Sequence, residues 1–193
     1  MDLSGRIENR LGLAYGRLGL GRLETAQGRY DLAADHLEDA VELFGSLGSA
    51  GLQAEAQISL AEALLRGGET EAAAGELERL REEDVRADQR SALHYLRGLL
   101  HLSQLNDGEP DGAEAALKEL RLSVEGSQGL QIPLLAQRWL SLIDAEELLG
   151  GQRSEATRRR AGNCLSEALQ RVPSEESRRM LRQLPGVSQL ISG

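Results

Sequence analysis

The chain has 193 residues, of which 40% are hydrophobic, 27% charged and only 3% aromatic. Its apolar residues are mostly Leu and Ala, which favour helices, so the composition argues against strands and against one large aromatic core. The net charge of −9 argues against nucleic acid as a partner. Neither a signal-peptide core nor a membrane-spanning run is present, and the single Cys164 fits a reducing compartment, so we expect a cytoplasmic protein without membrane contact.

A short pattern recurs three times at intervals of 40 residues, and each copy opens with glycine and closes with alanine. The copies run from Gly28 to Ala33, from Gly68 to Ala73 and from Gly108 to Ala113. Apolar residues follow each alanine four and seven positions later, which places them on one helical face: Leu37 and Ala40, Leu77 and Leu80, Leu117 and Leu120. Because an apolar helical stripe also precedes each glycine, the pattern predicts helix, glycine turn, helix.

In chain order, this pattern predicts helical hairpins over residues 1–47, 48–85 and 86–127. An irregular fourth hairpin is expected over 128–172, with Pro133 in the first turn of its first helix. Its second helix has an unsettled register, because Arg160 and Asn163 follow Ala156 where the repeat requires apolar residues. Residues 173–193 are expected to cap the array, with Ser174 as the N-cap of a short helix that stops at Pro185.

These features resemble the tetratricopeptide repeat family in its longer bacterial variant. The Leu20-Gly21 pair, the turn residues Gly28 and Tyr30, and the alanines that open the second helices match the family pattern. Ala61 and His101 stand where the family has the small residue of the first helix, and the closing proline is missing. The resemblance implies one all-α domain over residues 1–193, a right-handed α-solenoid of about four antiparallel hairpins plus a C-terminal capping helix.

In this family the first helix of each hairpin lines a concave groove that binds a protein or peptide. Carrying the groove positions over by register gives Tyr15, Leu18, Arg22, Glu55, Ile58, Glu62, Arg66, Tyr95, Leu102 and Arg138. Gly98, Leu105 and Trp139 are further candidates, and each of these residues has the alternative of packing against a neighbouring helix. With Glu55 and Glu62 in the groove, a basic partner is favoured.

No residue pattern for catalysis is visible. The chain lacks a glycine-rich phosphate loop, and Cys164 lies in an apolar stripe with no histidine nearby in sequence, which favours a buried structural thiol. His94 and His101 are two helical turns apart, too far to share one metal ion easily, and His36 is remote in sequence. We therefore expect no enzyme activity, no cofactor and no metal.

Three functions stay open at this point. The first is a non-catalytic scaffold that binds a protein or peptide in the concave groove. The second is the ligand-sensing arm of a larger bacterial signalling regulator with an ATPase, kinase or transcription domain. The third is a homo-oligomerisation module, in which the apolar segment Val187–Ile191 serves either as a cap or as a homodimer contact.

Overall fold

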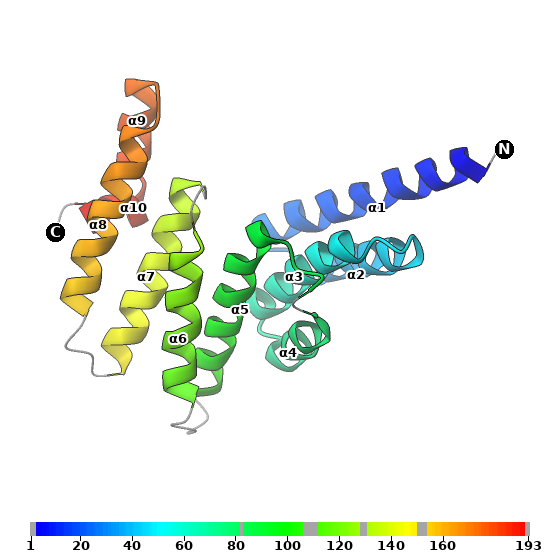
Figure 1. Cartoon of the computed structure of the whole chain (residues 1–193), viewed down its shortest axis with the longest axis horizontal. Helices are drawn as coiled ribbons and strands as arrows, with labels where there is room; N and C mark the ends of the chain where they lie inside the picture. The colour runs from blue at the N-terminus through cyan, green and yellow to red at the C-terminus, as the bar shows by residue number, and fades with distance from the viewer. Residues whose placement is uncertain (1–2, 82, 106–111, 128–130, 150–153, 192–193) are drawn as a thin grey trace. The chain divides into compact units, whose positions relative to one another are not determined.

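Ten helices make up the secondary structure in a computed structural model of the chain (Figure 1). The structure describes residues 3–81, 83–105, 112–127, 131–149 and 154–191, with side chains from residue 9 onward, and no strand occurs among them. The helices are α1 (Leu3–Ala26), α2 (Tyr30–Ser46), α3 (Ala50–Gly67), α4 (Thr70–Arg79), α5 (Ala87–Leu105), α6 (Gly112–Glu125), α7 (Ile132–Leu148), α8 (Ser154–Gln170), α9 (Glu175–Arg182) and α10 (Pro185–Ile191). The prediction of an all-α chain is confirmed.

Glycines with positive φ form two of the predicted turns. Gly28 follows α1 with a φ of +76°, and Gly68 caps α3 with a φ of +88°. This conformation turns the next amide back onto the helix, so Arg29 N donates to Glu24 O at 3.0 Å and Glu69 N to Leu64 O at 2.9 Å. The turns at Gly28 and Gly68 are confirmed, and the expected third one at Gly108 lies outside the described residues.

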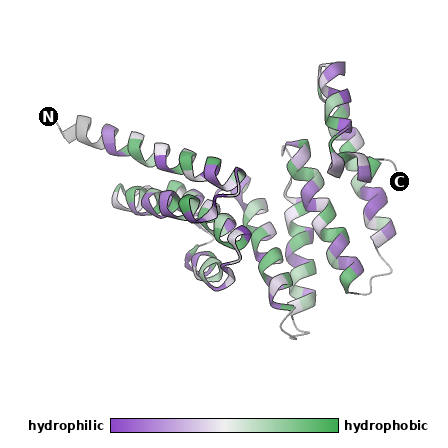
Figure 2. Cartoon of the chain, turned by 180° about the vertical axis from the view of Figure 1, so that it is seen from behind, coloured by the Kyte–Doolittle hydropathy of each residue, from purple (hydrophilic) through white to green (hydrophobic). Residues whose placement is uncertain are grey.

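The chain divides into two compact units, Met1–Leu96 and Arg97–Gly193, and the boundary falls inside α5. In the N-terminal unit α2 packs against both α1 and α3, and α3 packs against α4. The predicted stripe on α2 is fully buried at Ala33, Leu37 and Ala40, together with Phe44. Apolar residues recur along every helix of this unit, α1 included (Figure 2).

In the C-terminal unit α7 packs against α6 and α8, and α10 packs against both α7 and α8. Helix α7 begins at Ile132 with Pro133 in its first turn, as predicted. It buries residues around most of its circumference, among them Leu135, Trp139 and Ile143, because α6, α8 and α10 all contact it. It is therefore the central helix of this unit.

The apolar stripe predicted for the third repeat is displaced in the structure. Ala113 and Leu117 are only half-buried, whereas Ala116, Leu120 and Val124 are buried along α6. The close approach of α5 to α6 occurs at Gly98, where an added Cβ would lie 2.7 Å from Leu120 Cγ. The 40-residue spacing therefore misplaces this contact, and His101, predicted to take the small-residue position, is half-buried one turn later.

The register of α8, which the sequence left unsettled, is set by burial. Thr157, Ala161, Leu165 and Leu169 are buried at helical spacing, while Ala156 is exposed. The buried face thus starts one residue after the position that the repeat pattern favours. Arg160 and Asn163 consequently lie on the exposed side of the helix.

The C-terminal segment contains two short helices, where one capping helix was predicted. Ser174 is the N-cap of α9 as predicted, since its hydroxyl accepts from Ser177 N at 3.3 Å. Helix α9 ends at Arg182, and Pro185 begins α10 instead of ending a helix. Val187 and Leu190 of α10 are buried, whereas no residue of α9 is.

Candidate binding groove

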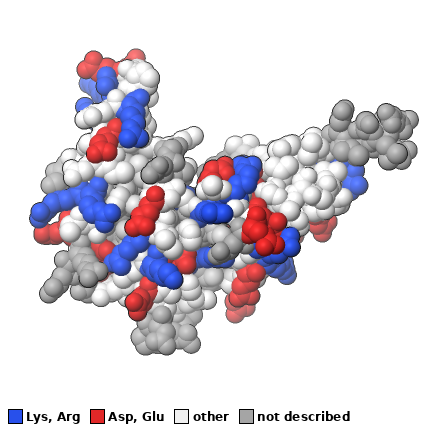
Figure 3. All heavy atoms as spheres, viewed as in Figure 1, with Lys and Arg blue, Asp and Glu red and all other residues white. Residues whose placement is uncertain are grey.

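Most of the predicted groove residues of the N-terminal unit are either buried or already paired. Leu18 and Ile58 are 3% and 7% exposed, so their side chains belong to the interior. Glu62 pairs with Arg66 at 2.8 Å within α3. On the face drawn in Figure 3, acidic and basic side chains are interspersed.

Glu55 is the centre of a polar network. Arg22 Nη2 donates to Glu55 Oε1 at 2.8 Å and Arg22 Nε to Ser59 Oγ at 3.1 Å, which ties α1 to α3. Gln89 Nε2 donates to Glu55 Oε2 at 3.2 Å, and Arg86 lies 3.7 Å from the same oxygen. Because this carboxylate is compensated within the chain, it offers little attraction to a basic partner.

Two exposed arginines with acidic neighbours have raised pKa values. The hydrogen bond to Asp88 raises the pKa of Arg86 and lowers the pKa of Asp88. The hydrogen bond to Glu24 raises the pKa of Arg29 and lowers the pKa of Glu24. All four groups are therefore charged at neutral pH and paired with each other.

Part of the predicted set surrounds one small cleft. Arg22, Glu62 and Arg66 line it together with Thr25, Ala26 and Ser59, and its volume is about 210 Å³.

The other predicted residues lie outside this cleft. Tyr15 is 49% exposed and its ring meets that of Phe44 edge-on, with 5.4 Å between the centroids. Tyr95 and Leu102 are half-buried in α5, and Arg138 is buried in α7.

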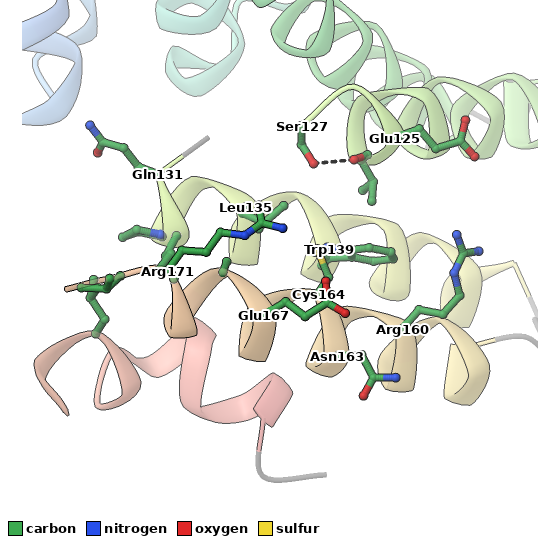
Figure 4. A pocket seen from close by; sticks show the side chains of 16 residues that line it. Glu125, Ser127, Gln131, Leu135, Trp139, Arg160, Asn163, Cys164, Glu167 and Arg171 are labelled. Atoms are coloured by element: carbon green, nitrogen blue, oxygen red, sulfur yellow. Dashed lines mark hydrogen bonds between the residues drawn. The ribbon is translucent and has the colours of Figure 1, made fainter. Parts of the chain in front are cut away.

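A large opening among the described residues lies in the C-terminal unit, with a volume of about 1030 Å³ (Figure 4). We call it the α7–α8 groove. One wall is the exposed face of α8, and the other comes from α7 and the end of α6, with Leu181 of α9 as a further lining residue. The α8 wall consists of Arg160, Asn163, Cys164, Glu167, Ala168 and Arg171. The opposite wall includes Val124, Glu125, Ile132, Leu135 and Trp139.

The α8 wall follows from the helical period. Its residues recur at spacings of three and four, so they share one face of the helix. The adjoining face, with Ala161 and Leu165, is buried. Figure 4 shows Arg160 and Arg171 at the two ends of this wall, with Cys164 and Glu167 between them.

The charged side chains of the groove differ from their neighbours in being unpaired. Arg158 pairs with Glu147 at 2.9 Å and Arg159 lies 3.7 Å from Glu155. Within the described ranges, no ion pair engages the groove side chains Arg160, Arg171, Glu125 or Glu167. These four charges are consequently available to a ligand.

Trp139 connects the groove to the interior. Its side chain is 5% exposed, and no described group accepts a hydrogen bond from its Nε1. The Arg160 guanidinium lies 5.9 Å from the centroid of the indole ring, within cation–π range. The sequence named Trp139 as a candidate but missed Arg160, because Arg160 was interpreted as a departure from the apolar pattern.

Cys164 was predicted to be a buried thiol, and that prediction is wrong. The residue is half-buried and lines the groove, because it lies at the edge of the buried face of α8 that Ala161 and Leu165 form. His36 contacts Arg17 through Nδ1 at 2.8 Å. Over the described part of the chain, no group of three or more potential metal ligands is found, and no helix has the length and hydropathy needed to cross a bilayer.

Comparison of the chain with protein-family models and with curated proteins gives no match.

Proposed function

We propose that the chain is a non-catalytic protein-binding module with the architecture of a tetratricopeptide-like, right-handed α-solenoid. Packing of each helix on the next from α1 to α4 and from α6 to α10 supports this architecture. So does a repeated close contact, since Gly21 of α1 faces Leu37 of α2 and Gly98 of α5 faces Leu120 of α6. In this interpretation α1 to α8 form four hairpins, and α9 and α10 cap the last one.

The α7–α8 groove is the binding site in this proposal, and its ligand is an amphipathic helix of a partner protein. The observation that carries the proposal is the α8 wall, a helical face that lines the groove and on which Arg160, Asn163, Glu167 and Arg171 are exposed. Helix-in-groove recognition uses apolar anchors at such a face, with polar groups at its rim. Ile132, Leu135 and Trp139 supply the apolar side of the groove.

The charges along α8 define the partner more closely. Arg160 and Glu167 are separated by two helical turns, about 10 Å along the axis, and neither is paired within the described chain. A partner helix with one acidic and one basic residue two turns apart complements both. The ligand is thus a helix of mixed charge, whereas the acidic residues Glu55 and Glu62 had favoured a basic one.

Selection of peptides on the intact protein tests this proposal. A phage-displayed library of helical peptides is enriched on the full chain, and the recovered peptides are synthesised and measured by calorimetry. Ala168→Trp fills the groove from α8, so we expect it to weaken binding of these peptides by at least about tenfold. Ala156→Trp makes the same change on an exposed, non-lining position of the same helix and is expected to leave the affinity unchanged.

Charge reversal tests the partner chemistry separately. The double variant Arg160→Glu with Glu167→Arg inverts the charge order along α8, and it should recover peptides with the inverse order of acidic and basic residues. If the peptides selected on the wild-type protein bind Ala168→Trp and Ala156→Trp equally well, the groove is not the binding site.

A further inference from the structure

Helix α9 adjoins the Arg171 end of the α7–α8 groove and buries none of its own side chains. Its Leu181 is half-buried and lines the groove, as do Arg171 and Val172 from the segment between α8 and α9. Because α9 adds no side chain to the hydrophobic core, packing of the C-terminal unit does not account for the charged residues that it carries. The position of Leu181 makes α9 a continuation of the groove.

The helical period decides which charged residues of α9 are next to the groove. At about 100° per residue, Arg178 lies about 60° from Leu181 around the helix and Arg179 about 160° from it. Arg178 is half-buried, whereas Arg179 is exposed. Glu175 and Glu176 lie about 120° and about 140° from Leu181. Of the charged residues of α9, Arg178 is therefore the nearest to the groove, and Arg179 is directed away from it.

The Arg171 end of the groove carries an excess of positive charge. Within the part of the chain that the structure describes, neither Arg171 nor Arg178 takes part in an ion pair. Glu167 lies one helical turn before Arg171. In Figure 4 the carboxylate of Glu125 points away from the Arg171 end, and the uncharged Gln131 lies at that end. Two unpaired guanidinium groups therefore stand against one carboxylate, that of Glu167.

Two arginines beside an apolar side chain suit an acidic segment of a partner. A guanidinium group can donate two parallel hydrogen bonds to a carboxylate, and it stays charged at neutral pH. Leu181 offers an apolar contact next to these donors. A single exposed ion pair contributes little by itself. A helix that the groove already holds can make the extra contact without a second loss of translational and rotational freedom.

We propose that the partner helix continues past the end of α8 onto α9, where an acidic turn contacts Arg171 and Arg178 and an apolar side chain packs on Leu181. This inference rests on the proposed function of the groove and specifies its partner further. Along α8 the charges follow in the order Arg160, Glu167, Arg171, at spacings of seven and four residues. A partner helix aligned with α8 presents an acidic, a basic and a second acidic residue at the same spacings.

This surface fits a polypeptide better than an anionic membrane. Around α9, Glu175 lies between Arg178 and Arg179, about 60° from the first and about 40° from the second. A flat anionic surface would therefore meet a carboxylate among the arginines. A chain segment that leaves the groove beside Leu181 reaches Arg178 and leaves Glu175 outside the contact.

A double-mutant cycle on the full chain tests the acidic contact. The probes are the helical peptides that the phage selection recovers, each made also with the acidic residues of its α9-proximal turn changed from Glu to Gln. Arg178→Gln should weaken binding of the parent peptides about two- to fivefold in calorimetry at low salt. The Glu-to-Gln peptides should bind Arg178→Gln no more weakly than the parent peptides do, because the contact is already lost.

Arg179→Gln is the matched control, since it makes the same change on the neighbouring residue, which is directed away from the groove. It should leave the affinity unchanged, and circular dichroism should show equal helicity for both variants. Peptides that Ala168→Trp blocks but that bind Arg178→Gln and Arg179→Gln equally overturn this inference and leave the groove in place. Peptides that Ala168→Trp does not affect remove both. Binding to phosphatidylserine vesicles that Arg178→Gln weakens, without an effect on any peptide, would assign α9 to a membrane instead.

Discussion

At Gly21 the absence of a side chain decides how closely α1 approaches α2. The nearest atoms to an added Cβ belong to Leu37, which is completely buried in the core of the N-terminal unit and has no free space to move into. Gly98 has the same relation to Leu120 in the C-terminal unit. At these two positions glycine serves helix packing, and a larger residue must push two helices apart.

Gly21→Ala is expected to destabilise the protein. Overpacking against Leu37 costs about 1–3 kcal/mol, which outweighs the gain in helix propensity of up to about 1 kcal/mol. Gly75→Ala has the same gain and no collision, so it should be neutral or stabilising. Urea unfolding followed by circular dichroism measures both variants, and equal stability of the two would show that the α1–α2 contact tolerates a methyl group.

At the scale of elements, α8 illustrates how one helix serves two purposes. Ala161, Leu165 and Leu169 face the interior of the C-terminal unit, while Arg160 and Glu167 face the α7–α8 groove. Both faces run along four turns of the same helix. The residues that are buried therefore determine which residues of α8 can line the groove. A change on the buried face is therefore expected to act on stability, and a change on the groove face on binding.

Leu165→Ala tests the buried face. The residue is fully buried, so its truncation should cost about 2–5 kcal/mol through lost burial and the cavity that remains. Leu148→Ala removes the same atoms at a position that is 67% exposed in α7, and it should change the free energy of unfolding by less than about 0.5 kcal/mol. Similar costs for the two variants would mean that the register of α8 is wrong.

At the scale of the whole molecule, the chain consists of two units whose boundary lies within α5. The single Trp139 belongs to the C-terminal unit and is 5% exposed, so its fluorescence reports the unfolding of that unit alone. Helical circular dichroism reports both units. The two signals can therefore be used to ask whether the units unfold separately.

Leu37→Ala should separate the two signals. Leu37 is fully buried in the N-terminal unit, so its truncation destabilises that unit by about 2–5 kcal/mol. We expect the urea midpoint from circular dichroism to fall more than the midpoint from Trp139 fluorescence. Equal shifts of both midpoints would show that the units unfold as one cooperative system.

The candidate site was harder to predict than the helices. Arg22, Glu62 and Arg66 line one small cleft, whereas Leu18, Ile58 and Arg138 are buried. Sequence register identifies which residues share a helix face, but which face another helix covers depends on the packing of the whole unit. For that reason Arg160 and Cys164, both on the α7–α8 groove, were assigned to other roles.

By itself, the sequence determined that the chain is helical and where several of its helices start or stop. The local signals for this are the Leu and Ala content, the glycines at positions 28 and 68, Pro133 and Ser174, and they act through residues close in the chain. The tertiary structure decided the register of α8, the displaced stripe on α6 and the location of the open groove. Those features depend on contacts between residues distant in sequence, where burial selects one of several faces that the local pattern permits.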